Sequence, residues 1–315
     1  MNIHRPARSL SLSVAVGSLV TAWLVSGCAP APRKPGSPAV PALEANALFA
    51  GHDVVDLTVL LSETLPGHWG TYPAFQRWTY NWFTPVKNEY GTVRVPSDGP
   101  FYGQRFVLDE HTGTQTDFPA HFLPPPGSGL PHAGPMGTLT GDKYPLDRMM
   151  GPAVVIDVTD KVDAAENGKS ALITLADVRA WERKHGEIKA GEVVLFYSGY
   201  TDKYYKPMPE GLRMTHDVIV TKTKPGWPAP EPEVMTYLRG KGVWHLGTDG
   251  PSIGPAQAGQ ATHVAGLELG MAWEEMLVNL GKLPPRGAFY VALPIKIVDQ
   301  SGSPTRAVAF VPRRP

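Results

Sequence analysis

Residues 110–122, which read EHTGTQTDFPAHF, are the part of this sequence best suited to chemistry. If the segment runs extended, its odd-numbered side chains lie on one surface. These side chains are His111, Gln115, Asp117 and His121. Imidazole and carboxylate groups together can bind Zn, Mn or Fe(II), and an ion held there would lower the pKa of a bound water to about 7. The alternative is a polar turn whose histidines satisfy backbone groups, and spacing alone does not separate the two.

The same segment resembles a family signature, HxGTHxDxPxH. It is the signature of the cyclase-like metal hydrolases, which include bacterial kynurenine formamidases and isatin hydrolases. The match runs from His111 to His121 and departs from the formamidase pattern only at Gln115. Four more matches follow the family's order along the chain: residues 56–58 (DLT), the turn 247–252 (GTDGPS), His263 with Glu275 twelve residues later, and residues 302–309 (GSPTRAVA).

The resemblance implies a role for each matching residue. In the family, the first motif joins a later histidine and glutamate around one or two divalent metal ions. Carried over, this predicts that Zn or Mn is held by His111, Asp117, His263 and Glu275. His121 matches the family's catalytic histidine, which acts as general base and acid.

For some residues, the role suggested by the local sequence alone differs from the role that the family resemblance implies. Because glutamine offers an amide oxygen in place of an imidazole nitrogen, we expect Gln115 to be a weak ligand or a hydrogen-bond donor at a weakened metal position. Glu274 and Glu275 are adjacent on a helix predicted over residues 271–280, and only the resemblance selects Glu275. Without it, His263 would be a solvated loop histidine. We expect His245 to be a core or near-site histidine and not a ligand.

A serine nucleophile is a rival interpretation, because residues 250–254 (GPSIG) fit the GxSxG pattern. An α/β-hydrolase elbow opens a helix and is followed by an acid and then a histidine. The residues after Ser252 form a poor helix, and no acid lies between Ser252 and His263. We therefore expect Ser252 to be a turn residue near the site that contacts substrate, and a supporting role for Asp249 stays open.

Aromatic side chains crowd residues 68–83. They are Trp69, Tyr72, Phe75, Trp78, Tyr80, Trp82 and Phe83. At this density, without helical spacing, we expect most of them to pack loops against the core and one or two to stack on a flat aromatic substrate. In the family the N-terminal loop contributes to the substrate pocket. The predicted substrate-binding residues are Trp69, Phe118 and Ser252.

Short strands must position these residues. Runs of β-branched or aromatic residues predict strands over residues 53–61, 104–108, 153–158, 193–197, 243–246 and 289–293. Helices are predicted over residues 175–185, capped by Thr174, and over residues 231–239 and 271–280. This pattern indicates a mixed α/β fold rather than a doubly wound parallel sheet. The resemblance implies one cyclase-family domain over residues 48–315, with a mixed β-sheet and flanking helices of the swivelling β/β/α type.

The composition excludes several classes of function. The 315 residues include 29 Lys and Arg, 29 Asp and Glu, and one cysteine. A single cysteine excludes a disulfide framework and a thiolate zinc site. Four basic residues and no acid precede Glu44, so the remainder carries 25 basic and 29 acidic residues, a net charge of −4. A mildly acidic chain is not expected to bind nucleic acid.

Residues 1–27 resemble a bacterial signal peptide. A basic start precedes an apolar stretch over residues 10–25, and residues 25–28 (VSGC) resemble a lipobox in which Cys28 carries the lipid. An ordinary cleaved signal or an uncleaved anchor is the alternative. Residues 28–47 are proline-rich and predict a tether. We expect an exported protein of the cell envelope, on the periplasmic side or the cell surface, that meets the membrane only through its lipid.

These features together predict a metal-dependent amidohydrolase. The resemblance makes an aryl formamide such as N-formylkynurenine the first expected substrate, and a lactam or lactone of the isatin type is the alternative. A substrate-binding lipoprotein without turnover is the second class of function. The family resemblance also implies a homodimer or homotetramer.

Overall fold

The computed structural model describes residues 51–67, 69 and 75–313. The predicted signal peptide, Cys28 and the tether over residues 28–47 lie outside them. Within the described residues, no helix has both the length and the apolar character needed to cross a membrane.

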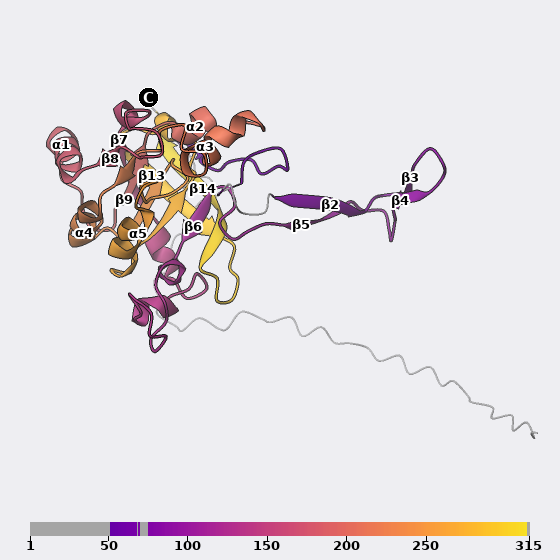
Figure 1. The fold of residues 1–315 in the computed structure, drawn as a ribbon, viewed down its shortest axis with the longest axis horizontal. Coiled ribbons are helices and arrows are strands. Elements are labelled where there is room, and N and C mark those ends of the chain that lie inside the picture. Colours follow the sequence, from indigo (N-terminus) through magenta and orange to yellow (C-terminus); the bar gives the residue numbers. More distant parts are fainter. Residues whose placement is uncertain (1–50, 68, 70–74, 314–315) are drawn as a thin grey trace, which may run out of the picture. The chain divides into compact units, whose positions relative to one another are not determined.

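A mixed sheet of eight strands forms the centre of the fold (Figure 1). The strands are β1 (His52–Asp56), β6 (Gln115–Asp117), β7 (Met150–Asp157), β9 (Val193–Tyr197), β11 (His245–Thr248), β12 (Ala272–Glu275), β13 (Arg286–Pro294) and β14 (Gly302–Pro312). Their order is β1-β14-β13-β7-β9-β11-β12-β6, and β6 also pairs with β14, so seven strands close into a ring. β7, β9, β11 and β12 are parallel, and the other pairings are antiparallel.

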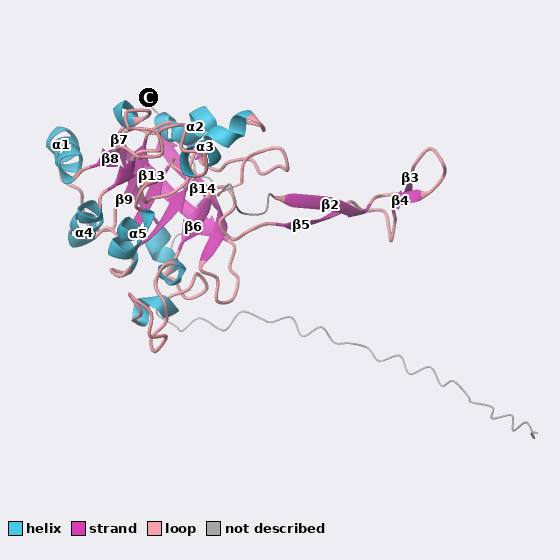
Figure 2. Cartoon of the chain, viewed as in Figure 1, coloured by secondary structure: helices cyan, strands magenta, loops and turns pink. Residues whose placement is uncertain are grey.

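The longer helices pack on one face of this sheet (Figure 2). The longer ones are α1 (Leu175–His185), α4 (Pro232–Gly240) and α5 (Gly259–Leu267), and the shorter ones are α2 (Tyr200–Tyr204) and α3 (His216–Ile219). Alternate residues of β9 serve two apolar cores: Val194 packs with the core under α1, α4 and α5, whereas Leu195 packs with the core on the other face. A strand that is buried on both faces has a continuous apolar sequence. For this reason both ends of β9 were predicted correctly from the sequence.

The predicted mixed α/β fold is confirmed, but one predicted helix is wrong. Residues 272–275 form β12, which pairs with β11 and β6 on its two edges. Met276 and Asn279 then take positive φ angles of 55° and 61°, which end any regular element. Tertiary strand pairing overrides the helical propensity of this segment. The sequence also did not predict α5 or the eleven-residue strand β14.

The expected packing of the aromatic stretch is wrong for several of its members. β2 (Gln76–Asn81) pairs with β5 (Gly103–Val107), and β3 (Val86–Lys87) pairs with β4 (Val93–Val95). Trp78, Trp82 and Phe83 on these segments are exposed. Trp82 contacts neighbouring aromatic rings, Phe83 and Tyr102, at centroid distances of 5.3 and 4.8 Å. Tyr72 lies outside the described residues.

Removing the N-terminal cap of α1 tests the predicted capping role of Thr174. Thr174 Oγ1 accepts a hydrogen bond from the Asp177 N–H at 3.3 Å, and Asp177 Oδ2 accepts one from the Thr174 N–H at 2.7 Å. Thr174→Ala should therefore lower the free energy of unfolding by about 1 kcal/mol in urea denaturation. Thr174→Ser keeps the accepting oxygen and should lose much less. Equal losses in the two variants would contradict the capping role.

Candidate metal centre

The three-residue strand β6 positions the first ligands. β12 and β14 pair with its two edges, and all three of its residues are buried. Side chains alternate along a strand, so Gln115 and Asp117 face one side and Thr116 the other. Gly113, at φ 71°, bends the chain before β6, and a 3-10 helix, η1 (Pro119–His121), follows it. The segment is thus extended only over β6, and its two turns bring the flanking histidines back toward Asp117.

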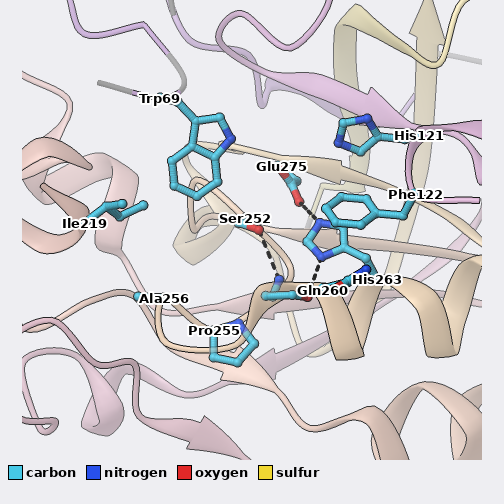
Figure 3. A pocket seen from close by; sticks show the side chains of 12 residues that line it. Trp69, His121, Phe122, Ile219, Ser252, Pro255, Ala256, Gln260, His263 and Glu275 are labelled. Atoms are coloured by element: carbon cyan, nitrogen blue, oxygen red, sulfur yellow. Dashed lines mark hydrogen bonds and ion pairs between the residues drawn. The ribbon is translucent and has the colours of Figure 1, made fainter. Parts of the chain in front are cut away.

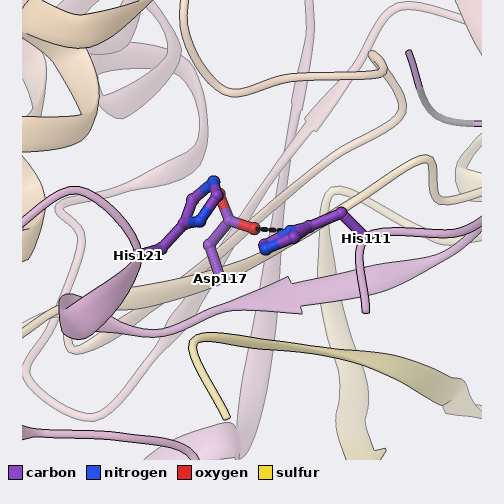
Figure 4. A group of neighbouring side chains, drawn as sticks. All are labelled: His111, Asp117 and His121. Carbon is purple, nitrogen blue, oxygen red and sulfur yellow. Dashed lines mark ion pairs between the residues drawn. The ribbon is translucent and has the colours of Figure 1, made fainter. Parts of the chain in front are cut away.

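His111, Asp117 and His121 form the first ligand group (Figure 4). Nδ1 of His111 lies 3.0 Å from Oδ1 of Asp117. Nε2 of His121 lies 4.0 Å from Oδ2 of the same carboxylate. The two imidazole rings are 3.9 Å apart between centroids. One ligand atom from each residue lies within 4.8 Å of the others, which is close enough for a shared ion.

Asp117 also belongs to a second ligand group, with His263 and Glu275. Nε2 of His263 lies 3.5 Å from Oδ2 of Asp117 and 3.5 Å from Oε1 of Glu275. Two ligand atoms at about 2.1 Å from one tetrahedral ion lie about 3.4 Å from each other. These separations are long for hydrogen bonds and fit ligands of a common ion. Asp117 therefore links the two groups.

Hydrogen bonds orient the second group toward this shared position. Nδ1 of His263 lies 2.8 Å from the Gly259 carbonyl oxygen one helical turn earlier, so Nδ1 is the donor and Nε2 faces the carboxylates. The Ile253 N–H donates to Glu275 Oε1 at 2.7 Å. His263 is buried in α5, and its reading as a solvated loop residue is wrong.

Strand geometry selects Glu275 over Glu274. Neighbouring residues of β12 point to opposite faces, a distinction that the predicted helix did not make. Glu275 faces His263, whereas Glu274 accepts hydrogen bonds from Thr116 and Tyr290 hydroxyls, both at 2.7 Å, and pairs with Nε2 of His245. His245 is a buried core residue near the site, as its sequence context suggests.

Gln115 lies directly opposite Glu275 in the ladder between β6 and β12. Its Nε2 donates to Glu275 Oε2 at 2.9 Å, so the amide holds the carboxylate in place. Its Oε1 is buried and accepts no hydrogen bond in the described part of the chain. A buried carbonyl oxygen normally has a partner, and an ion beside it would supply one. The donor atoms around Asp117 are all nitrogen or oxygen, which fits Zn or Mn.

The charges of the site are strongly interdependent. Burial by itself raises the pKa of Asp117, but His121, His111 and His263 hold it well below its usual range. Burial lowers the pKa of His263, yet the adjacent Asp117 and Glu275 prevail and raise it to about 10. The buried carboxylates of Asp117 and Glu275 thus require a positive charge beside them. A divalent ion can supply this charge in place of the proton on His263.

The pKa of His121 is shifted in the direction opposite to that of His263. Burial lowers the pKa of His121 to about 4, and His111 and His263 act in the same direction, against Asp117. The imidazole is therefore neutral near pH 7. A neutral histidine at the edge of a metal centre can accept a proton.

A cavity of about 400 Å³ lies beside the second ligand group (Figure 3). His121, His263 and Glu275 line part of it, and most of the remaining wall is apolar. That wall includes Trp69, Phe122, Ile219, Pro255 and Ala256. None of the described lining residues is a lysine or an arginine.

The predicted substrate-binding residues divide between this cavity and the core. Trp69 and Ser252 line the cavity. Ser252 Oγ accepts the Gly254 N–H at 3.2 Å, as expected of a turn, and the next helix, α5, begins only at Gly259, which does not fit a nucleophile elbow. Phe118 does not line the cavity: it is fully buried against Tyr144, at a centroid distance of 5.6 Å, because it follows β6 on the face that packs into the core.

Residues 55–255 match the family model described as Cyclase. The chain belongs to the cyclase family. It is 34% identical over 240 residues to the isatin hydrolase of Roseibium aggregatum, covering 73% of this chain and 83% of that protein. It is 31% identical over 238 residues to the kynurenine formamidase of Salinibacter ruber, covering 75% and 89%. The solved structure of isatin hydrolase A from Ralstonia solanacearum matches it with a TM-score of 0.66 at 29% identity, over 89% of this chain and 100% of that one. The family resemblance of the sequence is thereby confirmed.

Gly302 leaves the space that the His111 ring fills, and this gives a test of the first ligand group. Gly302 is opposite Asp117 in the pairing of β14 with β6, and a Cβ atom at this position would overlap the His111 imidazole. Gly302→Ala should displace His111 and weaken Mn²⁺ binding by about tenfold or more in isothermal titration calorimetry. In the matched control, Gly240→Ala, the added Cβ meets nothing within 4 Å. Equal affinity in the two variants would contradict this placement of His111.

Proposed function

We propose that this cyclase-family chain is a metal-dependent hydrolase that cleaves the amide C–N bond of a small aromatic substrate. The observation that carries the proposal is the position of Asp117, which is shared by two ligand groups at the edge of a largely apolar cavity. Mostly apolar cavities with a few convergent polar groups are typical of sites for small molecules.

The chain's own residues divide the work. His111, Asp117, His263 and Glu275 would hold the ion, and Gln115 orients Glu275 through its amide nitrogen. A divalent ion in this position would lower the pKa of a bound water and polarise a substrate carbonyl. His121, neutral near pH 7, accepts the proton from water and delivers it to the leaving nitrogen.

The cavity favours a neutral lactam of the isatin type over N-formylkynurenine. N-formylkynurenine carries an amino-acid group with a carboxylate, which an arginine or lysine would normally bind. The described residues of the cavity wall offer no such cation, whereas the apolar side chains of Trp69 and Phe122 suit a flat uncharged ring. This reverses the order of substrates expected from the sequence.

Hydrolysis by the purified protein tests this proposal. The protein is treated with a chelator, and Mn²⁺ or Zn²⁺ is then restored while the absorbance of isatin and of N-formylkynurenine is followed. We expect turnover only with the ion, with a higher kcat/KM for isatin. A higher value for the formamide would overturn the substrate order. If neither substrate were turned over with either ion, the proposed hydrolase activity would be contradicted, and a substrate-binding lipoprotein would be favoured.

Two variants separate ion binding from proton transfer. Asp117→Ala should lose the ion, because both ligand groups contain this carboxylate. His121→Ala should keep the ion and lose activity by about 100-fold or more. Inductively coupled plasma mass spectrometry gives the ion content of each protein. His132, an exposed histidine paired with Glu268, provides the control His132→Ala. A full rate in His121→Ala, or loss of its ion, would contradict the assignment.

We also propose export and self-assembly for this chain. The support for export is the basic and apolar start of the sequence followed by the only cysteine, Cys28, which would carry the lipid. The support for a homodimer or homotetramer is the family resemblance. An envelope location favours an environmental substrate over a cytoplasmic metabolite, in agreement with a lactam of the isatin type.

A further inference from the structure

A second cavity lies next to the proposed substrate cavity and shares Trp69 with it. Its volume is about 310 Å³. The residues that line it include Glu63, Leu65, Pro66, Met208, Leu212 and His216. Helix α3 also borders both spaces, because His216 at its start lines the second cavity and Ile219 at its end lines the first. Trp69 is therefore a wall residue common to the two cavities.

Trp69 packs against a fixed aromatic cluster. Its ring lies 6.0 Å from the ring of Trp227, which is fully buried and lies 6.2 Å from Tyr200. Nε1 of Trp227 donates to the Gly254 carbonyl at 3.0 Å, and the Tyr200 hydroxyl donates to the Met214 carbonyl at 3.0 Å. These hydrogen bonds fix the surface on which Trp69 rests. The indole is thus a packed part of the wall of both cavities.

The second cavity has the chemistry of an apolar subsite. Leu65, Pro66, Met208 and Leu212 supply hydrocarbon surface. Its carboxylate, Glu63, is neutralised by Arg77, whose Nε lies 3.0 Å from Oε1 of Glu63. An uncharged apolar group is therefore the ligand that this space would accept.

The substrate cavity has two distinct sides. Figure 3 shows Trp69 and Ile219 on one side and His121 with Phe122 on the other. A substrate whose scissile bond faces His121 and Glu275 directs the far edge of its ring toward Trp69. Any substituent on that far edge meets the indole.

We propose that Trp69 determines specificity by closing the substrate cavity against the second cavity. It excludes aromatic lactams that carry a large apolar substituent on the ring edge opposite the scissile bond. Replacing the indole with a methyl group joins the two cavities and admits such substrates. This inference rests on the proposed lactam hydrolysis and names the size class of its substrate.

The test compares isatin with 5-phenylisatin on the full-length protein. The measured quantity is the ratio of kcat/KM for 5-phenylisatin to that for isatin, since losses of folded or ion-loaded protein cancel in a ratio. Trp69→Ala should raise this ratio by about tenfold or more, because pocket size discriminates at that scale. Trp69→Phe, which keeps most of the wall, should raise it less. An unchanged ratio in Trp69→Ala would overturn the proposal.

Refilling the second cavity provides the matched control. Leu212→Trp in the Trp69→Ala background places an indole in that cavity and should return the ratio toward the wild-type value. If the gain persisted, the substituent would lie elsewhere and the assignment would be wrong. Dissociation constants of the two lactams, from quenching of protein fluorescence, give the same ratio without turnover. A protein that cleaves neither lactam would refute the proposed function, and the binding ratio would still decide the role of Trp69.

Discussion

The buried carboxylate of Asp117 is the interaction on which the rest of the site depends. It contacts His111, His121 and His263, and accepts a hydrogen bond from Trp273 Nε1 at 3.2 Å. A buried carboxylate is stable only when cations or hydrogen-bond donors surround it. Here α5 and β12, both distant in sequence, must meet the segment that carries His111, Asp117 and His121. The closed ring of strands brings them together.

The ring holds Asp117 through a strand of only three residues. Both edges of β6 are occupied, so its register fixes three contacts at once: Gln115 with Glu275, Thr116 with Glu274, and Asp117 with Trp273. On the face away from the ion site, Glu274, Tyr290 and the Thr116 hydroxyl form a buried hydrogen-bond network. A shift of β12 by one residue along β6 would exchange the two faces of β12 and place Glu274 at the ion site. The buried hydrogen-bond network on one face of β6 and β12 thus helps to fix the register that positions the ligands on the other face.

Much of this arrangement could be predicted from the sequence, but for different reasons in different places. Apolar runs such as β9 and the Thr174 cap are local signals, and they gave the strand and the start of α1 correctly. The resemblance supplied His263 and Glu275, which the structure brings together with Asp117. The helix predicted over residues 271–280 failed because pairing with β6 and β11, which is not local, decides the conformation of that segment. Phe118 was misplaced for a related reason, since local sequence does not show which face of the fold a residue after β6 will meet.

The function proposed for the chain depends on an ion at Asp117, and anomalous diffraction tests this most directly. Crystals of the protein grown with Mn²⁺ would be measured near the manganese absorption edge. The account predicts an anomalous peak within coordination distance of Asp117 and of His263 or His111. A peak elsewhere, or crystals with Mn²⁺ in the solvent and no peak at Asp117, would contradict it.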